Sequence, residues 1–236
     1  MRTSRIGGVV LSASAMFGVA QAAGAAIIVF TDPGLPGLAA EAEFNLVNAT
    51  TLEVRLRNVS TGAPGGFGSA DQLLTGVSFD LPGGLTITGG AGEIGPNSQS
   101  IDFDTGSYGP GTNIGGEWGF GNSGLSGALR NAISGNSAGI TDFGGPNLDG
   151  PAGLNGPQGG LVANPAVVSL GGLGAIQDEA IFVVTLSGAI DNLSWLLDRG
   201  VRVEFGSDAA FITVPAPASI GLLTGVTLLT ARRRRA

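Results

Sequence analysis

Residues 41–60 read EAEFNLVNATTLEVRLRNVS and contain the clearest periodicity in the chain. Apolar residues occupy every second position in two runs, 42–46 and 52–56, with mostly polar or charged residues between them. An alternation of period two predicts two strands that each bury one face. The short polar break Asn48-Ala49-Thr50 predicts a turn, so the two strands form a hairpin.

Further short strands are expected on both sides of this hairpin. A run rich in Leu, Val and Phe covers 72–81 and ends at the turn sequence Pro82-Gly83-Gly84, and AIFVVTLS covers 180–187. Asp191–Asp198 is either a helical turn or a connection. The other candidate strands are 25–30, 85–88, 100–104, 202–206 and 210–214, with short ones around Trp118 and Phe143. Many short strands with turn signals predict an all-β fold, an antiparallel β-sandwich or jelly roll.

Glycine is concentrated in one part of the chain. Residues 61–160 hold 29 of the 43 glycines among 236 residues. Glycine does not recur at every third position there, so a collagen helix is excluded, and no GGxGxD array is present. We therefore expect long glycine-rich loops on a sheet scaffold.

The composition excludes most catalytic mechanisms. The chain has no histidine, cysteine or lysine. Mechanisms and sites that need an imidazole, a thiolate or an amine are therefore absent, among them the Ser-His-Asp triad, thiolate zinc sites and Schiff bases. Carboxylate or metal–carboxylate chemistry remains.

The charge is unevenly distributed. Residues 23–213 contain five arginines and all 18 acidic residues, a net charge of −13, against −7 for the whole chain. A body this acidic lacks the basic face that nucleic-acid binding requires, so no nucleic acid is expected as a partner. Self-repulsion of this kind suits a soluble or surface-exposed domain.

The first 22 residues have the three parts of a secretory signal peptide. Met1–Arg5 is short and positive, residues 6–19 are apolar and uncharged, and Ala20-Gln21-Ala22 is an A-x-A cleavage site. An N-terminal membrane anchor is the alternative, but the apolar stretch is short for about 30 Å of hydrocarbon. We expect cleavage after Ala22, with the Sec translocon and signal peptidase as partners.

The last 23 residues also have three parts. The segment Val214-Pro215-Ala216-Pro217-Ala218-Ser219 is extended, because proline fixes φ and disfavours helix before it. Residues 220–231 are mostly apolar and predict a short hydrophobic helix, and Arg232, Arg233, Arg234 and Arg235 follow. Arginines of this kind stay on the cytoplasmic side of a membrane, which places the body outside. A plain tail anchor and a buried helix with a basic end are the alternatives.

This order of proline motif, apolar segment and arginine cluster resembles the PEP-CTERM sorting signal of exported proteins in Gram-negative, often biofilm-forming bacteria. The resemblance implies that an exosortase, a membrane-embedded cysteine protease-transpeptidase, recognises and cleaves the tail. Val214, Pro215, Pro217, Ala218 and Ser219 match the recognition motif. Ala216 departs from it, since glutamate is usual there, and the motif is a V-P-A-P variant.

The body also resembles the domains that commonly precede this tail. The resemblance lies in TLEVRLRNVS, LLTGVSFDLPGG and AIFVVTLSG followed by VRVEFGSD. It implies a fold and no activity. The expected organisation is a signal peptide over 1–22, a β-sandwich surface domain over 23–213 and a sorting signal over 214–236.

Two loops contain enough oxygen ligands to suggest calcium. Asp102-Phe103-Asp104 resembles the start of a calcium loop, although the glutamate that should complete it is not at the required spacing. Asp142, Asn147 and Asp149 form a second oxygen-rich loop. Carboxylates that alternate on a strand also occur as an ordinary solvated face, so no cofactor is the default expectation.

Three further site types follow from single residues. Tyr108, Trp118 and Phe120 are candidates for an aromatic platform that stacks on sugars, although Trp118 and Trp195 suit core packing better. A carboxylate pair is the only enzyme candidate, for glycoside hydrolysis, and no pair stands out. The N-glycosylation pattern occurs at Asn48, Asn58 and Asn192.

The function predicted from these features is that of an exported surface or extracellular-matrix protein without catalysis. It is held briefly at the inner membrane and then cut and released, or attached to surface polymer. A binding module for extracellular polysaccharide, aided by calcium or not, is the alternative. A carboxylate-based hydrolase is a third.

Overall fold

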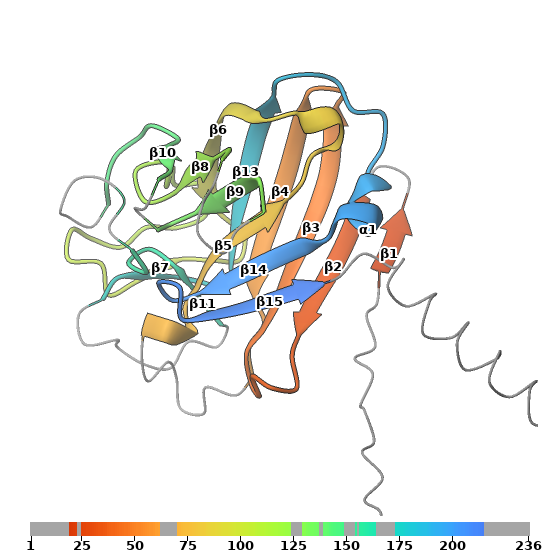
Figure 1. Ribbon diagram of the computed structural model, residues 1–236. Coiled ribbons are helices and arrows are strands. Elements are labelled where there is room, and N and C mark those ends of the chain that lie inside the picture. Colours follow the sequence, from red (N-terminus) through yellow and green to blue (C-terminus); the bar gives the residue numbers. More distant parts are fainter. Residues whose placement is uncertain are drawn as a thin grey trace, which may run out of the picture.

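The computed structural model describes residues 19–22, 25–61, 70–123, 129–136, 139–148, 154, 156–163 and 173–214. Within these ranges the chain is almost entirely strands and turns, which confirms the predicted all-β fold (Figure 1). The one α-helix there, α1 (Trp195–Arg199), lies inside the stretch expected to be a helical turn or a connection.

One sheet is built around the quoted hairpin. Its six strands are β1 (Val19–Ala22), β2 (Ala25–Thr31), β3 (Ala39–Asn48), β4 (Thr51–Asn58), β13 (Glu179–Leu186) and β6 (Ile87–Ile94), in that spatial order. The hairpin prediction is confirmed, since β3 and β4 pair antiparallel with Phe44 opposite Val54. Every second residue of β4 from Leu52 is buried, as the alternation predicts.

The second sheet is assembled from nine shorter strands. They are β10 (Thr141–Asp142), β8 (Gly119–Gly121), β9 (Asn131–Ser134), β5 (Leu74–Phe79), β11 (Leu161–Val162), β12 (Ala175–Gln177), β7 (Ser100–Ile101), β14 (Val201–Phe205) and β15 (Ala210–Val214). β5 is the hub, since it pairs with β9, β11 and β14. The pair β11–β12 is parallel, unlike the antiparallel pairing expected throughout.

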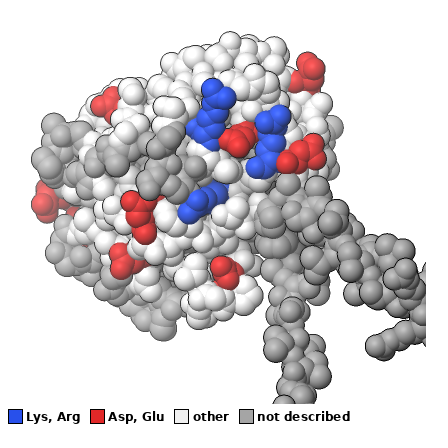
Figure 2. Space-filling view, viewed as in Figure 1, with Lys and Arg blue, Asp and Glu red and all other residues white. Residues whose placement is uncertain are grey.

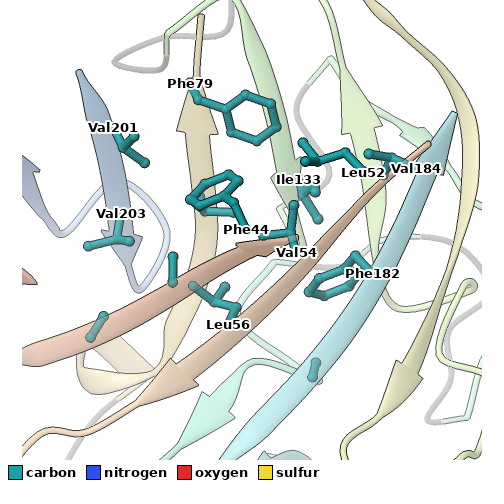
Figure 3. Packing of buried hydrophobic residues seen from close by; sticks show 14 of the residues in the cluster. Phe44, Leu52, Val54, Leu56, Phe79, Ile133, Phe182, Val184, Val201 and Val203 are labelled. Carbon is teal, nitrogen blue, oxygen red and sulfur yellow. The ribbon is translucent and has the colours of Figure 1, made fainter. Parts of the chain in front are cut away.

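One hydrophobic core lies between the two sheets. Phe44 of β3 and Phe79 of β5 contribute to it from opposite sides, and their ring centroids are 5.4 Å apart in an edge-to-face arrangement. Figure 3 shows these rings together with Val54, Leu56 and Phe182, all projecting into the same interior. The glycine-rich stretch contributes Trp118 to this core, so that part of the chain packs against the sheets.

The strand boundaries differ from expectation in the glycine-rich part. β6 extends to Ile94, beyond the predicted 85–88, while β7 is shorter than the predicted 100–104. β9, β11 and β12 were not predicted. They are short strands without clear alternation, and their partners are distant in sequence, so local pattern does not reveal them.

Candidate functional site

The predicted sorting motif begins inside the last strand. Val214 ends β15 and is paired with Val201 of β14. Its other residues, 215–219, and the cluster Arg232–Arg235 lie outside the described residues. The motif therefore starts at a residue held in the second sheet, with no linker between fold and motif. In the part of the chain that the structure describes, no helix is long and apolar enough to cross a membrane.

The predicted signal cleavage site lies at the edge of the first sheet. Ala20 and Ala22 belong to β1, where they stand opposite Ile27 and Ala25 of β2. Residues 1–18, the rest of the predicted signal peptide, lie outside the described residues. β2, the neighbour of β1, also contacts β15, the strand that ends at Val214 (Figure 1).

The acidic candidates for calcium are spread over exposed turns. Asp102, with φ of 55°, and Asp104 are exposed, and Phe103 between them is buried. Asp142 uses its carboxylate to accept a hydrogen bond from the Gly144 amide at 3.1 Å. Across the described ranges, no group of three or more acidic side chains gathers where a metal ion could be held. Asp149 lies outside those ranges.

The proposed aromatic platform does not form. Trp118 is fully buried, its indole N–H donates to the Gly159 carbonyl at 3.0 Å, and its ring lies 4.9 Å from that of Phe182. Tyr108 packs against Phe103 instead, at 6.0 Å between ring centroids. A ring without exposed surface cannot stack on a sugar, so the platform was wrong and the core role of Trp118 is confirmed. Trp195 is also buried in the core.

The densest group of charges lies at the outer face of the first sheet. The Arg57 guanidinium is 3.4 Å from Glu41, 3.4 Å from Asp178 and 3.6 Å from Glu179. Glu179 is buried, and Arg55 lies 4.0 Å from the same carboxylate oxygen. Burial lowers the pKa of Arg57, but the three carboxylates, led by Asp178, raise it by more, so its pKa is raised overall.

This charge cluster has the chemistry of a structural network. The salt bridges of Arg57 join β4 to Glu41 of β3 and to Asp178 and Glu179 at the start of β13. The alternation of apolar and polar residues places Glu41 on the outer face of β3 and Arg57 on the outer face of β4. The hairpin register then makes them direct neighbours. Asp178 and Glu179 arrive from a strand more than 100 residues later, so no local pattern could include them.

A second charged group lies at β14. Glu204 accepts hydrogen bonds from the Asn136 side-chain amide and, at 3.0 Å, from the Asp208 backbone N–H. Burial raises the pKa of Glu204, and the Asp208 carboxylate adds to this, while the two hydrogen bonds and Arg202 oppose it. The Arg202 guanidinium lies 3.8 Å from the ring centroid of Phe211.

A groove of about 490 Å³ lies beside α1. Two carboxylates, Asp191 and Asp198, line it with the amide of Asn192 and the guanidinium of Arg199. The Asn192 side chain is committed to a turn, since it accepts a hydrogen bond from the Ser194 amide at 2.9 Å. Figure 2 shows a largely uncharged surface on which basic and acidic residues lie next to one another in the upper part of the view.

Comparison with known proteins found no match to a family model, to a curated protein or to a solved structure.

Proposed function

We propose that the chain is an exported surface protein without catalytic activity, held at the membrane by residues 214–236 and cut there by an exosortase. One observation carries the proposal. The last described strand ends at Val214, the residue at which the proline motif, the apolar segment and the arginine cluster begin. The last described strand therefore ends at the first residue of the predicted sorting signal.

The position of the two processing sites supports this proposal. β1 contains the predicted signal cleavage site, and its neighbour β2 contacts β15, from which the sorting tail continues. During export the chain is attached to the membrane first through its N-terminus and then through its tail. A body whose two ends lie close together can exchange one attachment for the other without turning over.

We further propose that the body is a β-sandwich that serves as a scaffold. Two sheets that share one core support this architecture. Stability then comes from sheet packing, since the chain contains no cysteine for a disulfide. Any chemistry performed on the protein would come from the processing enzymes.

Mass spectrometry of the protein from the surface fraction of a Gram-negative host that contains an exosortase tests the proposal. We expect the mature chain to begin at Ala23 and to end between Pro217 and Ser219. A Pro217→Ala variant should keep its arginine cluster, while Pro36→Ala, a matched change in the body, should be processed normally. A surface protein that retains Arg232–Arg235 would contradict the sorting step.

Polysaccharide binding is the second candidate function, and the groove beside α1 favours it. Its volume lies in the range of small-ligand sites, and the two carboxylates and the guanidinium in its lining are suitable partners for sugar hydroxyls. Binding to a glycan array, with and without calcium, tests this candidate. Asp191→Asn and Asp198→Asn should weaken binding at least several-fold, whereas Asp104→Asn, far along the chain on an exposed turn, should not. If no glycan on the array binds the protein, polysaccharide binding is contradicted and the scaffold role is retained.

A further inference from the structure

The outer edge of β2 is covered by a segment that export is expected to remove. β1 (Val19–Ala22) pairs antiparallel with Ala25–Ile28 and is the neighbour of β2 on that side. Cleavage after Ala22 would separate β1 from the body. β2 would then be the edge strand of the first sheet, paired only with β3.

β2 lacks the features by which sheet edges avoid pairing with other chains. Its sequence, AAIIVFT, contains no charge, no proline and no glycine. Natural edges usually carry lysine or proline, a bulge or a cover. The opposite edge of the same sheet is different. Its strand β6 contains three glycines and one glutamate, and Glu93 forms an isolated antiparallel β-bridge with Asn113.

We propose that the β2 edge, once β1 is removed, pairs antiparallel with β2 of a second copy of this chain. The inference rests on the proposed function, since signal cleavage exposes the edge. The pairing of β1 demonstrates that an antiparallel strand can be added at this edge. A two-fold axis perpendicular to the sheet keeps Ala26, Ile28 and Phe30 of both copies on the core side, so the two sheets join into one.

The acidic charge of the body does not oppose this pairing strongly. Asp32 follows the end of β2, outside the paired strand, and its carboxylate accepts a hydrogen bond from the Gly34 amide. Glu41 and Glu43 of β3 lie one strand away from the edge. Across the joined sheet the two β3 strands are three strand spacings apart, about 14 Å at about 4.8 Å each. That distance exceeds the screening length of about 8 Å at physiological salt.

The association should be weak. A pair of seven-residue strands buries less than the roughly 1,200 Å² of a standard stable interface. Such contacts suit a surface protein that is crowded at a membrane or in a matrix, where the local concentration is high. The partner is another molecule of the same kind, and the resulting dimer is closed by symmetry.

Site-specific cross-linking tests the inference, because the natural chain has no cysteine. Single variants Ala25→Cys, Ile27→Cys and Val29→Cys are made in the full chain and exported from a Gram-negative host, and their N-termini are identified by mass. Residues directly opposite each other in an antiparallel pair have Cα atoms about 4.5–5.5 Å apart, within the range of a disulfide. The variant nearest the two-fold axis should give a disulfide-linked dimer.

Val183 offers a matched control. Val29 and Val183 are 36% and 39% exposed on the same outer face, but Val183 lies on β13, which is paired on both sides. Val183→Cys should remain monomeric. A lysine at another outer position of β2, Val29→Lys added to Ala25→Cys or Ile27→Cys, or Ile27→Lys added to Val29→Cys, should reduce the dimer about tenfold. Adding Val183→Lys should leave it unchanged.

The outcomes separate this inference from the proposed function. A mature chain that begins at Ala23 without a β2-specific cross-link, or with equal cross-linking at position 183, overturns the dimer and leaves export intact. A surface chain that retains residues 19–22 contradicts the signal cleavage itself, and the dimer inference fails with it.

Discussion

At the scale of single residues, Asn58 has a structural role that its sequence pattern does not reveal. Its side-chain amide donates to the carbonyls of Gln72 and Leu161, at 3.2 and 2.8 Å, and its oxygen accepts the Ser60 amide at 3.1 Å. The residue is 1% exposed. Asn58 therefore ties β4 to the second sheet, and its burial excludes it as a glycan acceptor in the folded chain, whereas Asn48 and Asn192 are exposed.

Replacing Asn58 should destabilise the fold strongly. Asn58→Ala leaves buried backbone groups without these partners, and we expect a loss of about 2–3 kcal/mol in the free energy of unfolding. Asn48→Ala is the matched control. That exposed asparagine only accepts hydrogen bonds from Thr50 within its turn, so its loss should be below about 1 kcal/mol. Equal losses in chemical denaturation would contradict this role.

Glu204 should make stability fall as pH rises. Its pKa is raised in the folded state, chiefly by burial, so the folded chain holds this proton more tightly than the unfolded chain. The contribution is complete below the unfolded pKa of about 4.3 and is lost as pH rises through the raised folded value. Relative to the natural chain, the Glu204→Gln variant should become progressively more stable as pH rises above the unfolded pKa of about 4.3. A stability difference that does not change between pH 4 and 8 would contradict the prediction.

At the scale of elements, β6 shows why its boundaries were underpredicted. It contains three glycines, which lower the strand propensity of its sequence. At Gly92 the lack of a side chain is required, because a Cβ there would lie 2.9 Å from the Phe182 ring. At Gly89 no heavy atom lies within 4 Å of such a Cβ. Glycine thus permits close packing at one position of this strand and is not needed for space at another.

These two glycines form a matched pair for mutation. Gly92→Ala should cost about 1–3 kcal/mol of stability through overpacking, because Phe182 is fully buried and held between other rings. Gly89→Ala should be neutral or should stabilise by up to about 1 kcal/mol, since alanine restricts the unfolded chain. Thermal or chemical unfolding of both variants measures the difference. A reversed order would show that β6 does not pack as described.

The elements also differ in how far they could be predicted. β3, β4 and β13 are long, and their apolar residues are placed by the pleat, so pattern alone located them to within about two residues. β9, β11 and β12 exist because β5 and its neighbours offer them backbone partners. A strand whose stability comes from distant partners leaves little trace in its own sequence.

At the scale of the whole molecule, the two tryptophans sample different parts of one core. Trp195 contacts Phe44 and Phe79, which come from opposite sheets, and Trp118 packs on Phe182. A core shared by both sheets should unfold as one unit. Each tryptophan alone can therefore report on the global transition.

Single-tryptophan variants test this cooperativity. Trp118→Phe and Trp195→Phe each leave one tryptophan, which can be excited selectively. In each variant the tryptophan fluorescence should change at the same denaturant midpoint as the circular dichroism. Each variant is compared with its own dichroism because either substitution alters core packing. Two separate transitions within one variant would mean that the sheets unfold independently.

The candidate sites also differ in whether they depend on a short segment of sequence or on tertiary structure. The processing signals at both ends could be predicted from sequence because translocation and sorting machineries recognise short linear segments. Both signals remain predictions. The calcium and aromatic candidates depended on side chains meeting in space. The fold buried Trp118 in the core and left Asp102 and Asp104 on a turn.

The sequence by itself determined the all-β class, the central hairpin and the exclusion of imidazole, thiol and amine chemistry. Each of these depends on residue type or on local spacing. Only the tertiary structure decided which charged residues meet around Arg57 and which glycines are required by packing. It also decided that β1 is the edge strand of the first sheet and pairs with β2. The physical reason is that these features are contacts between segments far apart in the chain, 121 residues for Arg57 and Asp178, and their energies depend on burial that no single segment possesses.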